Sequence, residues 1–509
     1  MAIVQDVAIV DYDFSRTNST YISNPGRSES TRLNHSSTFK LNGDNFYPAT
    51  LQESVDEDNI KQARKNGAVT PQMFGAVGNG TTDDTAALMA MFASTHEKIY
   101  FPDGTYVSDM TFINTKKQIT LSRKAIIKLK PGRPLSTLFQ VNAAAKGTTF
   151  SGGTLDGNRK HQKIAYGKLI LVYATDCVID KMTLINSISY GIEAIDASRL
   201  VVSNCTFRNN GYISLISHCE TTSNEGGSIL NNTVDNSLAA KGANVAGIMV
   251  RGNRDNTIKA KGWKIQDNTV IQPMGATFVE AECIEFRGED SDISSNVTIG
   301  GSLAISVVHS KNVTVANNSI KSPSVYGGEL AGSSLCIFTG NTVDAGKQPC
   351  EGLSVSTHAY DNIVVGNTFT NCTYGINQNI DAQGLTISNN TFLKNIVGLH
   401  LASKNVTCSG NYFDGQDVGK KGILLDNNEG SMTFTGNTFK SMTESSVMIY
   451  SASAVVIDKL VFTGNNFILT TNPPIEAVLS GRAKLGANIQ TKGNTRQPDY
   501  SNLRDRKPF

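Results

Sequence analysis

A short phrase of the form Gly-Asn-Thr-Phe returns, with small variations, through the second half of the chain. It is centred on Asn341, Asn367, Asn390, Asn411, Asn437 and Asn465. Subtraction gives spacings of 26, 23, 21, 26 and 28 residues between successive asparagines. A repeat of this length around a fixed polar residue is typical of a solenoid, in which each coil buries its apolar side chains only against its neighbours. The phrase therefore favours one long repetitive fold.

Short runs of alternating apolar and polar residues flank each phrase, with the period of a β-strand and not of a helix. A second run, a glycine followed by an aliphatic residue, begins at Gly352, Gly375, Gly398 and Gly422. Two or three short strands per repeat predict an all-β fold, a parallel β-helix of roughly a dozen to fourteen coils. At about 4.8 Å per coil, such a rod is on the order of 60 Å long.

Asparagine suits the recurring corner because it tolerates a left-handed backbone and can hydrogen-bond to an asparagine one coil away. The Asn-X-Thr triplets also match the acceptor pattern for glycosylation. We favour the structural role, since the triplets keep the phase of the repeat and the first residues, Met-Ala-Ile-Val-Gln-Asp, lack the pattern of a secretory signal.

The two ends of the chain do not share the repeat. Residues 1–68 are polar and then predict a helix over Leu51–Lys65, with acidic residues near its start and basic residues near its end. We interpret residues 1–68 as a head or attachment segment and residues 69–470 as the β-helix. Residues 471–509, which contain Pro473-Pro474 and a basic stretch, are expected to form a C-terminal tail.

Composition excludes several classes of protein. The formal net charge is +2 and no basic stretch is interleaved with aromatic residues, so we expect no nucleic-acid partner. No apolar run approaches the length of a membrane-spanning helix, so we expect no membrane insertion. The 8 cysteines include no Cys-X-X-Cys pair and the 7 histidines are not clustered with them, which predicts buried free thiols, no metal site and no cofactor.

Two motifs follow the N-terminal segment. They read Phe74-Gly-Ala-Val-Gly-Asn-Gly-Thr-Thr-Asp-Asp-Thr and Phe101-Pro-Asp-Gly-Thr-Tyr. Together they resemble the start of the solenoid in the pectate-lyase-like superfamily. The resemblance implies a single-stranded right-handed parallel β-helix with a short N-terminal capping helix. We expect Thr81 or Thr82 to cap that helix and Asp83 and Asp84 to lie in its first turn as capping residues, not as a catalytic pair.

Alignment of the coils on the glycine-aliphatic phrase predicts which side chains face outward. The inward column holds Ile192, Ile248, Ile284 and Ile305. The next residues, which should point outward, are Glu193, Met249, Glu285 and Ser306. Two positions further along lies a second outward column of Ile195, Arg251, Arg287 and Val308, with His218 beside Arg251. A register error of one residue would reverse every one of these side chains.

The stretch from Glu280 to Asp290 holds five carboxylates in eleven residues, although only 18% of the chain is charged. Carboxylates on one face raise each other's pKa, which favours one as an acid and another as a base or nucleophile. We take Glu285, with Glu282 or Glu193, as the candidate catalytic pair. The candidate substrate-binding residues are Arg287, Arg251, His218 and Glu280, of which the arginines suit an acidic sugar. The alternative is a solvated acidic edge that two arginines balance.

The other candidate side chains are tyrosines and histidines. Tyr190, Tyr212 and Tyr374 are expected to face outward, where they could stack on sugar rings or cover the edge of the core. His309, His358 and His400 lie in later coils, and stacking or hydrogen bonding is the better explanation for a lone histidine there.

The whole architecture resembles the tailspikes of bacteriophages: a short N-terminal segment, a capping helix, a long β-helix, a terminal tail and no secretory signal. The resemblance implies a homotrimer that binds and cuts a bacterial surface polysaccharide, a capsule or an O-antigen, at the host cell surface. It also implies a virion protein, made in the bacterial cytoplasm and joined to the baseplate or tail through residues 1–68. It covers roughly residues 70–470 at the level of fold, and no catalytic residue is transferred from it.

Three functions follow from these expectations. The first is an endo-acting glycosidase that uses paired carboxylates and no cofactor. The second is a polysaccharide lyase, in which a base such as His218 acts beside a uronic acid whose charge Arg251 and Arg287 neutralise. The third is a protein that grips polysaccharide without cutting it. New reducing ends favour hydrolysis, an unsaturated product that absorbs ultraviolet light favours elimination, and binding without shortening favours adhesion.

Overall fold

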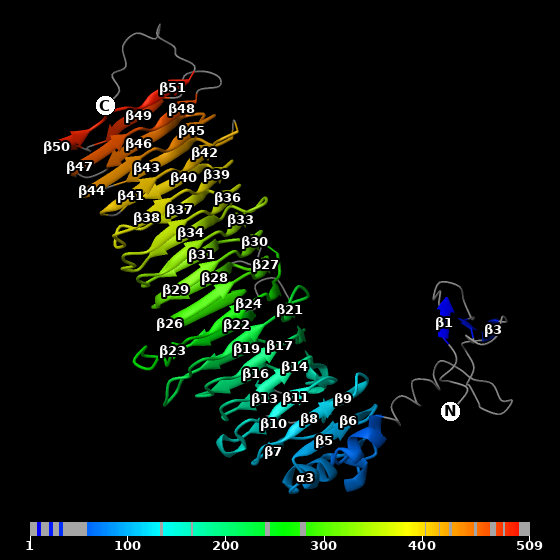
Figure 1. Cartoon of the computed structure of the whole chain (residues 1–509). Helices are drawn as coiled ribbons and strands as arrows, with labels where there is room; N and C mark the ends of the chain where they lie inside the picture. Colours follow the sequence, from blue (N-terminus) through cyan, green and yellow to red (C-terminus); the bar gives the residue numbers. More distant parts are fainter. Residues whose placement is uncertain are drawn as a thin grey trace.

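The computed structural model describes residues 8–11, 20–23, 30–33, 59–132, 136–163, 166–239, 245–274, 281–402, 404–416, 418–426, 430–451, 456–468, 475–481 and 484–497. Three short strands pair antiparallel near the N-terminus: β1 (Ala8–Asp11), β2 (Thr20–Ser23) and β3 (Ser30–Leu33). The other described strands stack along one axis as an elongated rod (Figure 1). They form three parallel ladders.

Ladder 1 consists of β7 (Thr111–Ile113), β10 (Ser136–Val141), β13 (Gly167–Val172), β16 (Tyr190–Ile195), β19 (Ile213–His218), β22 (Ala246–Arg251), β26 (Ile284–Ser294), β28 (Leu303–Val308), β31 (Tyr326–Ala331), β34 (Glu351–Ser356), β37 (Tyr374–Gln378), β40 (Val397–Leu401), β43 (Lys421–Asp426), β46 (Ser445–Ser451) and β49 (Ile475–Gly481). Ladder 2 shares the second half of β26 and otherwise consists of β5 (Lys98–Phe101), β8 (Gln118–Leu121), β11 (Thr149–Ser151), β14 (Val178–Asp180), β17 (Val201–Ser203), β20 (Ser228–Leu230), β23 (Ala260–Lys261), β24 (Lys264–Gln266), β29 (Lys311–Ala316), β32 (Ile337–Thr339), β35 (Ile363–Val365), β38 (Thr386–Ser388), β41 (Val406–Ser409), β44 (Ser431–Thr435), β47 (Val456–Thr463) and β50 (Lys484–Gln490). Ladder 3 consists of β4 (Asn79–Asp83), β6 (Gly104–Ser108), β9 (Ala125–Leu129), β12 (Thr154–Asp156), β15 (Thr183–Ile185), β18 (Thr206–Arg208), β21 (Thr233–Asp235), β25 (Thr269–Ile271), β27 (Val297–Ile299), β30 (Ser319–Lys321), β33 (Thr342–Asp344), β36 (Thr368–Thr370), β39 (Thr391–Leu393), β42 (Tyr412–Asp414), β45 (Thr438–Lys440), β48 (Asn466–Ile468) and β51 (Thr495–Gln497).

The chain returns to each ladder once per turn, and the fold is a right-handed parallel β-helix of about 15 turns. The predicted fold class is confirmed, with slightly more coils than the phrase indicated. The bridge between Val69 and Ile99 is the first described rung. At the other end, β49, β50 and β51 pair with the preceding coil, so the solenoid includes part of the expected tail, residues 471–509.

The asparagines of the recurring phrase form a buried ladder at the corner between ladders 2 and 3. The Oδ1 atom of Asn367 accepts hydrogen bonds from the backbone N–H of Asn341 at 2.8 Å and from its Nδ2 atom at 3.0 Å. The Nδ2 atom of Asn367 donates to the carbonyl oxygen of Phe338 at 2.8 Å. The same side-chain bond links successive coils from Asn232 to Asn494. Since the amides are satisfied inside the protein, the structure supports the structural role and not glycosylation.

Aromatic rings stack beside this corner, within ladder 3. The rings of Phe369, Phe392, Phe413, Phe439 and Phe467 lie nearly parallel, with centroids 4.7–5.3 Å apart. The glycine that opens each ladder 1 phrase faces this stack. A Cβ atom at Gly375 would lie 2.5 Å from both the carbonyl oxygen of Gly398 and the Cδ1 atom of Phe392. The close approach of the coils therefore requires glycine there.

A short helix covers the first coil, as expected. The helix α3 (Thr85–Ala93) buries Leu88, Met91 and Phe92, and the turn η1 (Pro71–Phe74) precedes it. Two further short helical turns are η2 (Ala143–Ala145) and η3 (Arg159–His161). Residues 59–65 are helical, and the rest of the helix predicted over Leu51–Lys65 lies outside the described residues.

The start of α3 differs from the prediction. Residues Asn79–Asp83 are strand β4, paired with β6, so neither Thr81 nor Thr82 caps the helix. The N-cap residue is Asp84, whose carboxylate accepts hydrogen bonds from the backbone N–H groups of Val77 at 2.7 Å and Gly78 at 3.2 Å. Both aspartates hold local structure, because Asp83 binds Thr85 and Lys130.

The cysteines behave as expected for structural thiols. All eight are buried and free. Burial raises the pKa of Cys177 to about 11 and that of Cys205 to about 12, so these thiols remain protonated and unreactive at neutral pH. Among the residues that the structure describes, no helix has the length and apolar character needed to cross a membrane.

Candidate functional site on the outer face of ladder 1

The predicted columns on the outer face of ladder 1 are confirmed by the strand register. The inward column of Ile192, Ile248, Ile284 and Ile305 lies in the hydrophobic core. The first outward column, which we call the outer column, runs through Glu193, Ile216, Met249, Glu285 and Ser306. A second outward column runs through Ile195, His218, Arg251 and Arg287.

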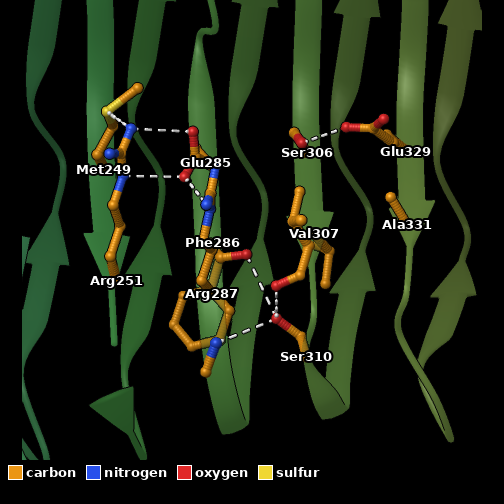
Figure 2. A network of polar contacts seen from close by, with 12 residues as sticks. Met249, Arg251, Glu285, Phe286, Arg287, Ser306, Val307, Ser310, Glu329 and Ala331 are labelled. Carbon is orange, nitrogen blue, oxygen red and sulfur yellow. Dashed lines mark hydrogen bonds and ion pairs between the residues drawn. The ribbon is translucent and has the colours of Figure 1, made fainter. Parts of the chain in front are cut away.

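Glu285 lies beneath two arginines (Figure 2). Its Oε1 atom is 2.9 Å from the Nε atom of Arg251 and 2.6 Å from the Nε atom of Arg287. Arg251 also donates from Nη2 to the Oε2 atom of Glu285 at 3.2 Å. The Glu285 side chain is 2% exposed, whereas those of Arg251 and Arg287 are 29% and 36% exposed. The guanidinium groups, and not the carboxylate, are therefore what this coil presents to a ligand.

Glu193 belongs to a separate ion-paired group. Its carboxylate contacts the Nζ atom of Lys168 and lies 3.3 Å from the Nε2 atom of His218. Burial raises the pKa of Glu193, but the hydrogen bonds from His218 and Lys168 outweigh it and lower the pKa below its ordinary value. Three ladder steps separate Glu193 from Glu285, which is about 14 Å at about 4.8 Å per step. This exceeds the separation at which two carboxyl groups share one glycosidic bond, so Glu193 is not retained as the partner of Glu285.

Glu282 and Glu280 are the other two predicted carboxylates of this stretch. Glu282 is buried two residues before the start of β26, and its backbone carbonyl accepts a hydrogen bond from the Nε2 atom of Gln272 at 3.0 Å. Glu280 lies outside the described residues. The acidic stretch does not form one face, because β26 continues from ladder 1 into ladder 2. Glu289, for example, pairs with Lys261 in ladder 2 at 3.3 Å.

The outer column continues beyond Ser306 with polar residues that the sequence alignment missed. It runs through Glu329, Ser354, Asn377 and His400. The Oγ atom of Ser306 donates a hydrogen bond to the Oε2 atom of Glu329 at 2.5 Å (Figure 2). Glu329 is half-buried, and burial raises its pKa, an effect that the charge of Glu285 increases and the Ser306 hydrogen bond reduces.

A second carboxylate, Glu351, lies one coil further along and three residues earlier in its strand. Burial also raises its pKa, and the charge of Glu329 adds to the effect. Its Oε1 atom accepts a hydrogen bond from the Nδ2 atom of Asn377 at 2.8 Å, whereas its buried Oε2 atom has no hydrogen-bond partner among the described residues. Tyr326 lies close to both carboxyl groups, which raise its pKa together with burial.

We call the carboxyl groups of Glu329 and Glu351, together with the adjacent phenol of Tyr326, the carboxyl cluster. All three groups carry raised pKa values, and raised pKa values on an outward face are typical of functional sites. Because the charge of Glu329 raises the pKa of Glu351, the two carboxyl groups lose their protons in turn, and an interval of pH exists in which Glu351 is an acid and Glu329 a carboxylate. This arrangement is suited to acid–base chemistry. In the described ranges no group of three or more His, Cys, Asp or Glu side chains is placed to hold a metal ion.

The comparisons with known proteins agree with this fold. A family model described as "Right handed beta helix region" matches residues 246–418. An N-terminal fragment of bacteriophage phi29 gene product 12 aligns with a TM-score of 0.58 at 15% identity, over 90% of this chain and 98% of the fragment. A search of curated protein sequences finds no match.

Two other solved structures are less similar in shape. PfbA, a surface adhesin of Streptococcus pneumoniae, has a TM-score of 0.48 at 15% identity, over 75% of this chain and 93% of the adhesin. The A-module of the mannuronan C-5 epimerase AlgE6 from Azotobacter vinelandii has a TM-score of 0.39 at 14% identity, over 84% of this chain and 99% of the module. At these identities the likeness concerns the fold alone.

Proposed function

We propose that this protein is a phage tailspike depolymerase that binds a bacterial surface polysaccharide, a capsule or an O-antigen, and hydrolyses it within the chain. The observation that carries the proposal is the carboxyl cluster, which lies on an extended polar column suited to a long polymer. The architecture as a whole, with its N-terminal segment, capping helix and long β-helix, and the likeness in fold to a phage protein support the placement on a virion. In this proposal the protein is a homotrimer attached to the tail or baseplate through residues 1–68.

Glu351 is the proton donor and Glu329 the carboxylate in this mechanism. Burial and the negative charge of Glu329 raise the pKa of Glu351, although hydrogen bonds from the side chains of Asn377 and Ser354 oppose the shift. Glu351 gives its proton to the oxygen of the glycosidic bond as the bond to the anomeric carbon breaks. Glu329 acts either as the base that takes a proton from the attacking water or as the nucleophile that is later released by water.

Glu285 is reassigned from an acid or base to a positioning residue. Its carboxylate is covered by Arg251 and Arg287, so it holds the two guanidinium groups in place and does not touch the polymer. Two guanidinium groups and one carboxylate leave these two coils with a net positive charge, beside the carboxyl cluster. The arginines are thus placed to bind a carboxylate of the polysaccharide.

The decisive experiment is incubation of the purified protein with capsular polysaccharide or lipopolysaccharide from a panel of bacteria. We expect one polymer to shorten, with new reducing ends and no unsaturated product. An ultraviolet-absorbing product would show that the reaction is elimination and not hydrolysis. Retention of the polymer without shortening would show that the protein binds the polymer and does not cut it.

Cleavage is expected to occur in a pH range that lies above the pKa of an ordinary glutamate, because the pKa values of Glu329 and Glu351 are both raised. Activity is lost as pH falls through the pKa of Glu329 and as pH rises through the pKa of Glu351, and both pKa values are raised above 4.5. Replacement Glu285→Gln removes a charge that raises the pKa of Glu329, so the acidic limb of kcat/KM against pH should move to lower pH. An unchanged acidic limb in a folded Glu285→Gln variant would contradict the assignment.

A further inference from the structure

The outer column does not end at the carboxyl cluster. Asn377 of β37 connects the cluster to the next coil, since its Nδ2 atom donates to Glu351 at 2.8 Å and its Oδ1 atom lies 2.7 Å from the Nδ1 atom of His400. The other ring nitrogen of His400 is 3.5 Å from the Oδ2 atom of Asp426 in β43. One line of polar contacts therefore crosses four coils, from Glu351 to Asp426.

An aromatic ring lies against the histidine in this line. The rings of Tyr374 and His400 are stacked, with centroids 5.0 Å apart and planes 27° apart. Both side chains are half-buried on the outer face of ladder 1. His400 is followed in the outer column by Leu424, so the polar part of the column ends here.

We infer that Tyr374, His400 and Asp426 form a second binding site on this face, a distal subsite that takes a neutral sugar ring of the polysaccharide. The inference rests on the proposed function. A stacked ring pair with acceptors at its rim matches a sugar, whose C–H groups cover an aromatic face and whose hydroxyl groups donate to Asp426 and Asn377. Three ladder steps separate His400 from Glu329, about 14 Å along the rod, so one polymer spans both.

The charges around the stack favour a neutral sugar. Burial lowers the pKa of His400, although the hydrogen bond and the charge of Asp426 oppose the effect. Asp426 and Glu351 surround the stack with carboxyl groups. Lys421, two coils beyond Tyr374 in the same ladder, is held by Glu444 at 2.5 Å. An acidic sugar is thus directed to Arg251 and Arg287 and away from this end.

The test uses a Glu351→Gln background, in which the polymer is bound and cut about 10²–10⁴-fold more slowly, and the capsular polysaccharide or lipopolysaccharide of the panel strain that the wild type shortens or retains. Tyr374→Ala is expected to raise the dissociation constant about tenfold, the effect of losing one stacking ring, whereas Tyr374→Phe keeps the ring and should bind like its parent. The matched control is Tyr360→Ala, because Tyr360 is 45% exposed and lies between β34 and β35, where it bridges to Ser334 and Gln383 outside the strands of ladder 1.

Equal binding by the folded Tyr374→Ala and Tyr360→Ala variants would overturn the subsite. So would failure of the Glu351→Gln protein to retain any polymer of the panel. Failure of the hydrolysis proposal gives a different result from failure of the subsite. A polymer that the wild type retains but never shortens would exclude the acid–base roles of Glu329 and Glu351, whereas Tyr374→Ala would still weaken binding. Thermal unfolding of each variant separates lost binding from lost folding.

Discussion

Replacement Glu351→Gln is expected to lower the rate of polysaccharide cleavage by about 10²–10⁴-fold, the usual cost of removing a general acid. The amide cannot donate a proton to the glycosidic oxygen, but its carbonyl oxygen keeps the hydrogen bond from the Nδ2 atom of Asn377. Glu329→Gln should lower the rate to a similar extent, because an amide can act neither as the base nor as the nucleophile. The variant should keep its local structure, since the Oγ atom of Ser306 can still donate to the amide oxygen. Release of reducing ends from the polymer that the wild type shortens measures both effects.

The matched control is Glu289→Gln, in the same coil as Glu285 but on ladder 2. Its carboxylate pairs with Lys261 and faces away from the outer column, so cleavage should proceed at the wild-type rate. Glu285→Gln should lose less activity than Glu351→Gln, since Glu285 acts only through its arginines. The opposite order, with Glu285→Gln inactive and Glu351→Gln as active as the wild type, would return the catalytic role to Glu285.

The fold could be predicted because the corner of each coil demands one residue type. Because each asparagine amide hydrogen-bonds to the coils on both sides, an asparagine recurs in the sequence once per turn. The last coil was missed although Lys492-Gly-Asn494-Thr repeats the phrase. It lies 29 residues after Asn465, and Arg496 occupies the position of the stacked phenylalanines, in register with Phe467. Phe467 is therefore the end of the phenylalanine stack in the described chain, and the repeat around Asn494 lacks the aromatic residue that marks the earlier phrases.

The register of the outer column could also be predicted, but the carboxyl groups with raised pKa values, Glu329 and Glu351, could not. The alignment relied on a glycine followed by an aliphatic residue, and β31 carries Gly328 at the aliphatic position. A Cβ atom there would lie 2.8 Å from the Cε2 atom of Phe338, whose ring fills the space from ladder 2. This substitution hid Glu329, the next residue in the strand. The burial of Glu285 could not be predicted from the sequence either, since it depends on how the side chains of Arg251 and Arg287 pack over it.

Replacement Asn341→Ala is expected to lower the free energy of unfolding by about 3–5 kcal/mol. Asn341 accepts hydrogen bonds from the backbone N–H and the Nδ2 atom of Asn318, each at 2.9 Å, and donates to the carbonyl oxygen of Val315 at 2.8 Å. Alanine removes these hydrogen bonds and the one that Asn341 donates to Asn367, whereas the Nδ2 atom of Asn318 keeps its bond to the carbonyl oxygen of Ile293. Thr342→Ala, at the exposed neighbouring position, should cost less than about 1 kcal/mol. Denaturant titration followed by circular dichroism compares the two variants. Equal stability would mean that water or backbone movement replaces the lost amide, and that the asparagine ladder positions the corner without stabilising it.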